Sequence, residues 1–509
     1  MLALFILFLY YPSYWLDNRG TSLSCRAMKG LDLEELSIRK ATPLSATATW
    51  GDLLKGKNGL LALALTGGVA LHAINVHIVT TVLPSVVQEI GGLDWYAWNT
   101  TLFVVASIIG AAMSVKLFYI LGARQAYISV LMIFAIGSVI CAFAISMPLM
   151  LIGRSIQGLG GGILAALSYA LIRVVFPSSL WSRAVALVSG MWGVATLCGP
   201  AVGGLFAQLG HWRWAFWILL PVSLLQGILV SAQLRPYTKL KSPSNKAPNI
   251  PMTQIFLLTC SVLAVAAGSM SMEIIWQSIG LISGLILGGT AIMWDKRTSV
   301  RLLPSSGAMI NMPLGATYAS IALLLIGTTT EIFVPYFLQT LHNYTPLAAG
   351  YLTALMAGGW SLGSLLSSGN HRANAMRLLR IGPMLCTISL LALALVIPNF
   401  LALELNLLTL LCGLTLFSAG AGVGIGWPHL VTQVLTLAPA NEEDMASAAI
   451  TTVQLYGMAI GAAAAGLVVN TAGLNNGTEG VQSAAVWLFG SFAIAPALAA
   501  ILAYRIIKN

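Results

Sequence analysis

The chain has 509 residues, of which 58% are hydrophobic and only 8% are charged, and its formal net charge is +10. A soluble protein of this length carries roughly 25% charged residues, so this chain could not cover a water-facing surface and needs lipid as the solvent for most of its length. The basic residues sit in short loops between apolar runs, which is typical of topology signals and argues against a nucleic-acid partner.

The cysteines and histidines show no pattern typical of a cofactor site. Of the six cysteines, five lie in apolar runs, where Cys acts as a small hydrophobic residue: Cys141, Cys198, Cys260, Cys386 and Cys412. No Cys or His spacing is typical of a metal site or a disulfide framework, and no phosphate-binding P-loop occurs. We therefore expect no metal, no cofactor, no enzyme activity and no use of ATP.

The N-terminal segment is the least regular part of the chain. Residues 1–16, MLALFILFLYYPSYWL, are short for a membrane span, contain Pro12 and lack both a basic n-region and a small-residue cleavage site. We interpret them as an interfacial stretch or as an upstream choice of start codon, with Met28 as the alternative start. Residues 1–58 are then an apolar stretch followed by a cytoplasmic tail.

Fourteen apolar runs that are each long enough to cross about 30 Å of hydrocarbon follow this tail. They lie near residues 59–83, 96–120, 126–146, 149–172, 183–208, 214–234, 255–271, 276–294, 313–338, 347–368, 376–397, 405–434, 445–470 and 483–506. The seventh run is the shortest. The sequence therefore predicts an all-α polytopic membrane protein.

Two polar loops divide these runs into six, two and six. The first, LRPYTKLKSPSNKAPNIPM at 234–252, is rich in Pro, Ser and Lys, and the second, DKRTSVRLLPSSGAMINM, covers 295–312. The predicted division is a six-helix bundle at 59–234, a cytoplasmic linker at 235–253, two linking helices at 254–294, a cytoplasmic loop at 295–312 and a second six-helix bundle at 313–507.

The distribution of Lys and Arg supports this count. If the N-terminal tail is cytoplasmic, every Lys and Arg except Arg154 and Arg213 falls at the cytoplasmic side of the predicted spans, as the positive-inside rule requires. Trp95, Trp98, Trp212 and Trp214 cluster at the opposite boundary, where an aromatic belt is expected. Both termini are then cytoplasmic.

Three segments resemble motifs of the major facilitator superfamily, and within it the fourteen-helix drug:proton antiporters. LIGRSIQGLGGG in the fourth run is similar to the fourth-helix motif, ATLCGPAVGGLF in the fifth run to the antiporter motif, and KLFYILGARQAY between the second and third runs to the gating loop. The matching residues are Arg154, Gln157 and Gly158; Gly199, Pro200, Gly203 and Gly204; and Leu117, Gly122 and Arg124.

The resemblance covers residues 59–507 and implies a major-facilitator fold of two six-helix bundles with two extra helices between them. It also implies alternating access around a site near the midplane, in a monomer in the bacterial cytoplasmic (inner) membrane. Two residues depart from the family pattern. Tyr119 stands where the gating loop usually has an aspartate, and Asn75 stands where the first helix often has one, so neither family role transfers to this chain.

Small residues in the two helix motifs permit close helix packing. Gly158 and Gly162 are four residues apart, as are Gly199 and Gly203, and Pro200 is able to kink the helix between them. A single glycine of this kind is more often an ordinary packing residue, whereas the combined Gly-Pro-Gly-Gly pattern favours a hinge and sliding face.

Arg154 and Glu331 are the ionisable residues expected inside predicted spans. Intramembrane charges are functional by default, although an arginine near a helix end also reaches the headgroups by snorkelling. The resemblance implies that Arg154 takes part in proton coupling. Because a guanidinium stays protonated, a titratable partner is needed, and Glu331 in GTTTEIFVPYFLQ is the best candidate. The alternative for Glu331 is a structural hydrogen bond to the preceding threonines or to Gln339.

Two histidines of the first run, His72 and His77, could also titrate near neutral pH, and we rank them below Glu331. Phe103 and Phe333, together with Asn75, Trp192, Tyr336 and Trp360, are candidates for lining a cargo cavity, although such aromatic residues more often face lipid or pack in the core.

The sequence thus predicts proton-coupled export of small organic or amphipathic compounds, with protons, cargo and the lipid bilayer as the only partners. The alternatives are a major-facilitator importer and a dedicated exporter of a sugar, siderophore or other metabolite. A membrane enzyme or a receptor is disfavoured, because the chain has neither clustered catalytic residues nor a soluble sensor domain.

Overall fold

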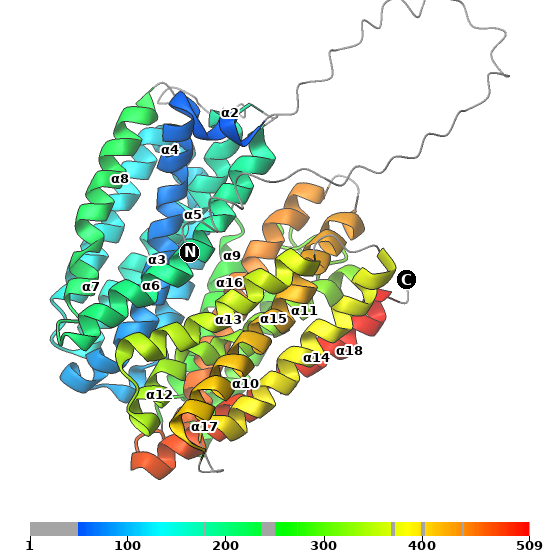
Figure 1. Cartoon of the computed structure of the whole chain (residues 1–509). Coiled ribbons are helices and arrows are strands. Elements are labelled where there is room, and N and C mark those ends of the chain that lie inside the picture. The colour runs from blue at the N-terminus through cyan, green and yellow to red at the C-terminus, as the bar shows by residue number, and fades with distance from the viewer. Residues whose placement is uncertain are drawn as a thin grey trace, which may run out of the picture.

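The computed structural model describes residues 49–177, 180–235, 250–271, 273–367, 372–398, 403–439 and 442–507. Every regular element within these ranges is a helix (Figure 1). The expected apolar stretch at 1–16, the alternative start at Met28 and most of the predicted linker lie outside the described residues.

The helices before the linker form one packed group, which we call the N-terminal bundle. They are α2 (Trp50–Leu54), α3 (Gly56–Ile90), η2 (Leu93–Trp95), α4 (Trp98–Ala142), α5 (Met147–Val175), α6 (Trp181–Gln208), α7 (Trp214–Trp217) and α8 (Leu219–Gln233). The short helix α2 begins with a capping box, in which Thr49 N donates to Asp52 Oδ2 at 2.7 Å. This backbone hydrogen bond and one from the Thr49 side chain hold the pKa of Asp52 below its usual value.

Two helices, α9 (Met252–Gly268) and α10 (Ile274–Asp295), form a hairpin between the bundles in sequence. The C-terminal bundle comprises α11 (Pro313–Thr328), η5 (Thr329–Ile332), α12 (Val334–His342), α13 (Pro346–Ser367), α14 (Arg372–Val396), α15 (Leu405–Leu437), α16 (Glu443–Thr471), α17 (Gly477–Phe492) and α18 (Ile494–Ile507). Figure 1 shows the two bundles side by side.

Twelve helical segments of the described chain are long and apolar enough to cross a membrane, so this is a multi-pass membrane protein. The expected number of fourteen is not reached by this measure. The helix α9 has only 17 residues, and α13 is not among the twelve because its glycines and serines lower its mean hydropathy.

The second and third expected spans are both present, as the segments Leu93–Ser114 and Lys116–Ala142. Together they make up the element α4 (Trp98–Ala142), which is interrupted by one non-helical residue, Gly122, at φ 74° and ψ 168°. A residue with a Cβ would be strained at this positive φ, so glycine allows the chain to reverse direction within a few residues.

The ninth expected span, 313–338, is broken in the structure into α11, η5 and α12. Two features of the sequence account for the break. Pro335 has no N–H to donate to the carbonyl of Glu331 one turn earlier. The hydroxyls of Thr328, Thr329 and Thr330 each donate to a carbonyl three residues back, at 2.6 to 3.1 Å, which bends helices. Glu331 therefore lies in a short 3-10 turn inside a membrane helix.

The two bundles contact each other mainly through α6 with α13 and through α4 with α16. The contacts lie toward the end of the molecule that carries η2, which we call the η2 end; the opposite end is the α2 end. Tyr96, next to η2, is fully buried and stacks on Phe333 with ring centroids 4.8 Å apart. The structure is thus closed at its η2 end.

The hairpin is attached to the loop that follows it. Asp295, at the last turn of α10, is buried, and its carboxylate accepts hydrogen bonds from Leu302 N at 2.6 Å and from Leu303 N at 3.1 Å. The amide of Gln254 in α9 donates to the same carboxylate at 3.2 Å. These bonds fix the base of the hairpin to the segment that leads into α11.

Candidate functional site

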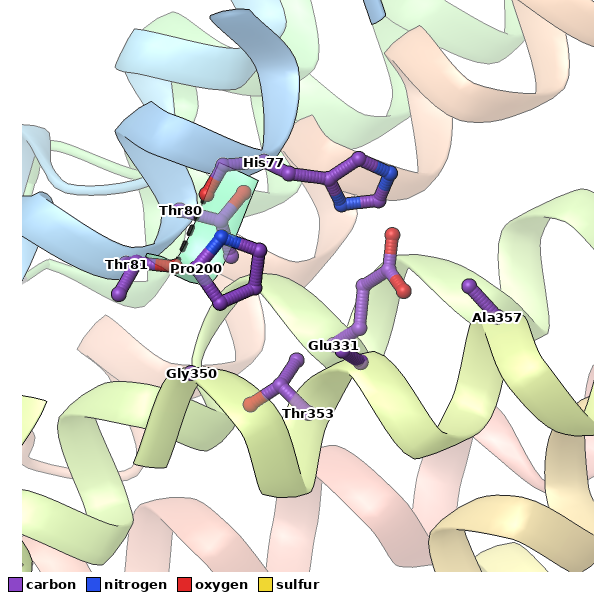
Figure 2. Close-up of a pocket in the computed structure, with 9 residues that line it drawn as sticks. His77, Thr80, Thr81, Pro200, Glu331, Gly350, Thr353 and Ala357 are labelled. Carbon is purple, nitrogen blue, oxygen red and sulfur yellow. Dashed lines mark hydrogen bonds between the residues drawn. The ribbon is translucent and has the colours of Figure 1, made fainter. Parts of the chain in front are cut away.

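A narrow cleft lies where the two bundles meet, next to η5 (Figure 2). The N-terminal bundle contributes residues of α3 and α6, and the C-terminal bundle contributes residues of η5 and α13. The lining residues are His77, Thr80, Thr81, Pro200, Glu331, Gly350, Thr353, Ala354 and Ala357. The space between them is about the size of one water molecule, so the cleft can hold water or a proton but no larger cargo in this conformation.

Glu331 is the acidic residue of this cleft. Its side chain points across the interface toward the His77 ring (Figure 2). Among the described residues no hydrogen bond and no cation is assigned to its carboxylate. The alternative of a structural hydrogen bond to the threonines or Gln339 is not found, because the three hydroxyls donate to their own helix and Gln339 Nε2 is buried without a partner.

His77 faces Glu331 from α3 of the other bundle. Its Nε2 lies 3.4 Å from the hydroxyl oxygen of Thr196 on α6. That hydroxyl also donates to its own helix, to Trp192 O at 2.9 Å. The cleft therefore brings one carboxyl group and one imidazole together from different bundles, an arrangement in which a proton can be bound at the interface itself.

The small residues of the antiporter-type motif on α6 pack against two different helices, α3 and α13. Gly199 and Gly203 face α3 of the same bundle, and a Cβ on Gly203 would lie 2.8 Å from the carbonyl oxygen of Ile78. Gly204 faces α13 of the other bundle, where a Cβ would lie 2.7 Å from the Cα of Leu347. Pro200 lies beside Gly350 of α13 and lines the cleft.

Arg154 lies inside the N-terminal bundle, with a side chain only 2% exposed. Its Nη1 donates to Gln157 Oε1 at 2.8 Å, its Nε donates to the carbonyl of Asn99 at 3.4 Å, and its guanidinium carbon lies 4.1 Å from the centre of the Phe103 ring. No carboxylate of the described residues forms an ion pair with it. The expected partnership with Glu331 is therefore not a contact in this conformation.

Gln157 and Gly158 connect Arg154 to α4. Gln157 Nε2 donates to Ser138 Oγ at 2.9 Å. Gly158 lies against the backbone of Phe103, where a side chain would not fit, and its carbonyl accepts a hydrogen bond from Ser107 Oγ at 3.0 Å. The fourth-helix motif thus holds α5 tightly to both halves of α4.

The three gating-loop residues lie in the middle of α4, where the chain turns at the α2 end of the molecule. Leu117 is partly buried, Gly122 makes the break in α4 described above, and Arg124 has a buried Nε without a hydrogen-bond partner.

None of the six expected cavity residues lines the cleft. Asn75 is fully buried and neither its amide nitrogen nor its amide oxygen has a partner. Trp192 is 38% exposed and meets His72 edge-on with ring centroids 5.9 Å apart. Tyr336 packs edge-on against Tyr96, and Trp360 packs in the same manner against Trp427.

Sequence reasoning missed the uncharged residues of the cleft, namely Thr80, Thr81, Gly350 and Thr353. Nothing in their local sequence distinguishes them from other small polar residues of membrane helices. They matter because two distant segments meet at them: a Cβ on Gly350 would lie 2.7 Å from the Thr81 side chain.

Comparisons with known proteins agree with this architecture. Residues 65–462 match the model of the Major Facilitator Superfamily. A Mycobacterium tuberculosis protein named "Probable multidrug-efflux transporter" is 37% identical over 466 residues, which cover 91% of this chain and 97% of that protein. "Multidrug resistance protein 3" of Bacillus subtilis is 25% identical over 438 residues, which cover 84% of this chain and 83% of that protein.

Solved structures show the same fold. A POT family transporter in complex with a thioalcohol-conjugated peptide superposes with a TM-score of 0.65 at 12% identity, covering 88% of this chain and 96% of that chain. A D-xylose-proton symporter superposes with a TM-score of 0.60 at 16% identity, covering 89% and 98%. Together with the helical bundles and the motifs on α5 and α6, these matches show that the chain belongs to the major facilitator superfamily of membrane transporters.

Proposed function

We propose that this protein is a proton-driven exporter of small organic, amphipathic compounds. The relatives named as multidrug-efflux and multidrug-resistance proteins, matched over most of the chain, support the export of drugs. The mostly apolar character of the chain and the lack of a nucleotide-binding loop support energisation by an ion gradient.

In this proposal the protein works as a monomer in a bacterial cytoplasmic membrane. The helices α9 and α13 cross the bilayer in addition to the twelve segments counted above, which gives fourteen spans, with the division of the chain at 235–253 and 295–312 given above. The η2 end faces outward and both termini lie in the cytoplasm, because this orientation places Lys and Arg on the inside.

The observation that carries proton coupling is the position of Glu331. A carboxyl group that is held between two moving bundles, without a cation or a hydrogen-bond donor to fix its charge, can change protonation state when its surroundings change. His77 of the opposite bundle is the group with which it exchanges or shares the proton.

The cycle follows from this position. When the outer side is open, Glu331 binds a proton from outside while cargo leaves. The neutral carboxyl then enters the closed interface without the cost of burying a charge. When the α2 end opens, the proton passes to the cytoplasm and cargo binds. One proton moves inward for each outward step of cargo.

Arg154 supplies a fixed positive charge inside the N-terminal bundle. It attracts the deprotonated Glu331 carboxylate across the interface and ceases to do so when Glu331 is neutral, which links protonation to the approach of the bundles. Gly199, Pro200, Gly203 and Gly204 form the sliding face of α6, and Leu117, Gly122 and Arg124 belong to the gate at the α2 end.

The test is reconstitution in liposomes that contain a pH-sensitive dye, with an imposed proton gradient and a panel of lipophilic cations, sugars and siderophores. We expect compound-dependent proton movement in the wild type and its loss in Glu331→Gln. Glu404→Gln is the matched control, because Glu404 is an exposed carboxylate at the start of α15.

Proton movement that survives in Glu331→Gln would remove Glu331 as the carrier and make His77→Gln the next variant. Proton movement coupled only to sugars or siderophores would replace multidrug export by a dedicated transporter.

A further inference from the structure

The helix α9 fills the seam between the two bundles on the side of α4 and α16. Ile255, Val262, Val265 and Ala266 of α9 belong to one buried apolar cluster with residues of both neighbours. Those residues are Phe103, Val104, Val105 and Ile108 of α4 and Ala459 and Ala463 of α16. The hairpin is therefore packed against both moving parts at once.

The hairpin itself is held together by a glycine stripe on α10. Gly280, Gly284 and Gly288 are four residues apart and are all buried. A Cβ on Gly284 would lie 2.9 Å from Ser261 O and 2.5 Å from a Val265 methyl group. Ser261 Oγ donates to Gly284 O at 2.7 Å and lies 3.0 Å from the hydroxyl oxygen of Tyr456 on α16.

Asn470 of α16 joins three parts of the molecule at the η2 end. Its buried amide nitrogen lies 3.0 Å from Asp94 O, in η2 of the N-terminal bundle, and 3.0 Å from Ser269 O, at the end of α9. An amide NH₂ group has two hydrogens, so both bonds form at the same time. Nearby, Asn475 Nδ2 donates to the Asp94 carboxylate, so the contact is reinforced.

We propose that Asn470 is the positioning residue of the outer gate, and that the α9–α10 hairpin holds it in place for that task. The bond to Ser269 fixes the amide in the one orientation that presents its second hydrogen to Asp94. Opening of the η2 end must break the bond to Asp94, whereas the bond to Ser269 stays. The inference rests on the proposed function only for its outward orientation of the η2 end.

The hairpin is then more than a spacer between the bundles. Without the hydrogen bond to Ser269 O, the Asn470 side chain would occupy several rotamers. Ordering it for the hydrogen bond to Asp94 would then cost conformational entropy, which weakens the closed conformation. Displacing the hairpin should therefore open the outer side, although the hairpin itself donates no bond to the N-terminal bundle at this point.

The experiment measures access to the cleft from each side of the membrane. In a full-length protein whose six cysteines are replaced, Thr80→Cys in the cleft is labelled with a membrane-impermeant maleimide in right-side-out and inside-out vesicles. Asn470→Asp keeps the size of the side chain and removes both donors. We expect outside labelling to rise roughly 2- to 12-fold, the factor for the one net hydrogen bond that opening breaks. Thr471→Ala, one residue later and exposed, is the control.

A double-mutant cycle tests whether the hairpin acts through Asn470. Gly284→Val pushes α10 away from α9, and we expect it to raise outside labelling when Asn470 is present and to add nothing in the Asn470→Asp background. If Gly284→Val does not fold, Tyr456→Phe, which removes only the contact to Ser261, takes its place.

Each outcome is decisive. Unchanged outside labelling in Asn470→Asp would overturn the role of Asn470. An additive effect of Gly284→Val would overturn the role of the hairpin. A rise seen only in inside-out vesicles would contradict the proposed orientation of the molecule, and with it the direction of transport, while leaving the contact itself supported.

Discussion

The interior of the N-terminal bundle and the interface between the bundles each contain an ionisable residue, and the two residues differ in how many bonding partners surround them. Arg154 is buried, bonded to Gln157 and Asn99, and covered by the Phe103 ring. Glu331 lies in a helix break, beside a cleft, and its carboxylate forms no hydrogen bond within the described part of the chain. Arg154, which keeps its charge, is surrounded by fixed partners, whereas Glu331, which we propose to be the proton carrier, lies without them among the described residues.

The glycines of the two regions also differ, in whether they pack helices within one bundle or across the interface. Gly158 presses α5 against α4 inside one bundle, while Gly204 presses α6 against α13 across the interface. Close approach inside a bundle stabilises a rigid body. Close approach at the interface stabilises only one of its conformations. The two regions should therefore respond to similar substitutions in different ways, and four predictions follow from that contrast.

The largest effect is expected from giving Glu331 the fixed partner that it lacks. Ala357 lies on α13 near the Glu331 side chain (Figure 2) and lines the cleft. Ala357→Lys places an ammonium group within reach of the carboxylate and holds it deprotonated. We expect proton-coupled efflux to fall to the level of protein-free liposomes. Ala357→Met, of similar length and without charge, should retain activity; equal loss in both variants would attribute the effect to size.

The glycine pair should separate folding from transport. We expect Gly158→Leu to lower the melting temperature in detergent, because overpacking a core costs about 1–3 kcal/mol. Gly204→Leu should leave the melting temperature within a few degrees of wild type and abolish transport, because the η2 end can no longer close. Gly190→Leu, at a site with open space, is the control. A melting temperature lowered as much by Gly204→Leu would contradict the contrast.

A smaller effect is expected from removing the fixed charge. Arg154→Met leaves Gln157 Oε1 and the Asn99 carbonyl without this donor, which costs roughly 1–3 kcal/mol of folding free energy. Arg154→Lys keeps the charge but loses the planar donor geometry, and should retain part of the proton coupling at reduced stability. Thermal melts and proteoliposome flux measured on the same preparations check both; full coupling in Arg154→Met would remove Arg154 from the mechanism.

The smallest effect concerns the surface of the N-terminal bundle. Arg213 Nη1 lies 2.5 Å from Glu89 Oε1, and both side chains are substantially exposed. Exposed ion pairs contribute about 0–1 kcal/mol, and salt weakens them further. Arg213→Ala should therefore change the melting temperature by only a degree or two and leave transport intact. Loss of transport in this variant would show that the outer surface of the bundle takes part in gating.

Much of the fold could be read from the sequence because lipid imposes strict rules. Membrane spans need long apolar runs, and the motifs on α5 and α6 have fixed spacings. The expected helix ends were less accurate: the chain turns at Gly122 rather than over a longer loop, and Pro335 with the preceding threonines interrupts the helix of another span. Both effects depend on single residues, whose consequences become visible only in the folded backbone.

The candidate site was only partly predictable. Glu331 was found because a carboxylate in a span is rare, but its partner was expected to be Arg154, and the structure places His77 opposite it instead. Glu331 and Arg154 are not in contact in this conformation, because contact between bundles is set by which helices face each other and not by charge. Whether Glu331, His77 or Arg154 carries out proton coupling stays a prediction.

The buried carboxylate of Asp295 has a mechanical consequence. Because it fastens the base of the hairpin to the segment that enters α11, and because Tyr456 holds the middle of the hairpin to α16, the hairpin must travel with the C-terminal bundle. The moving parts are therefore unequal in size. The larger one also presents the broad lipid-facing side of α10 to the bilayer, where Ile275, Ile282 and Leu285 are exposed. Anchored by this wider contact with lipid, it should act as the stationary frame, and the smaller N-terminal bundle should make most of the swing.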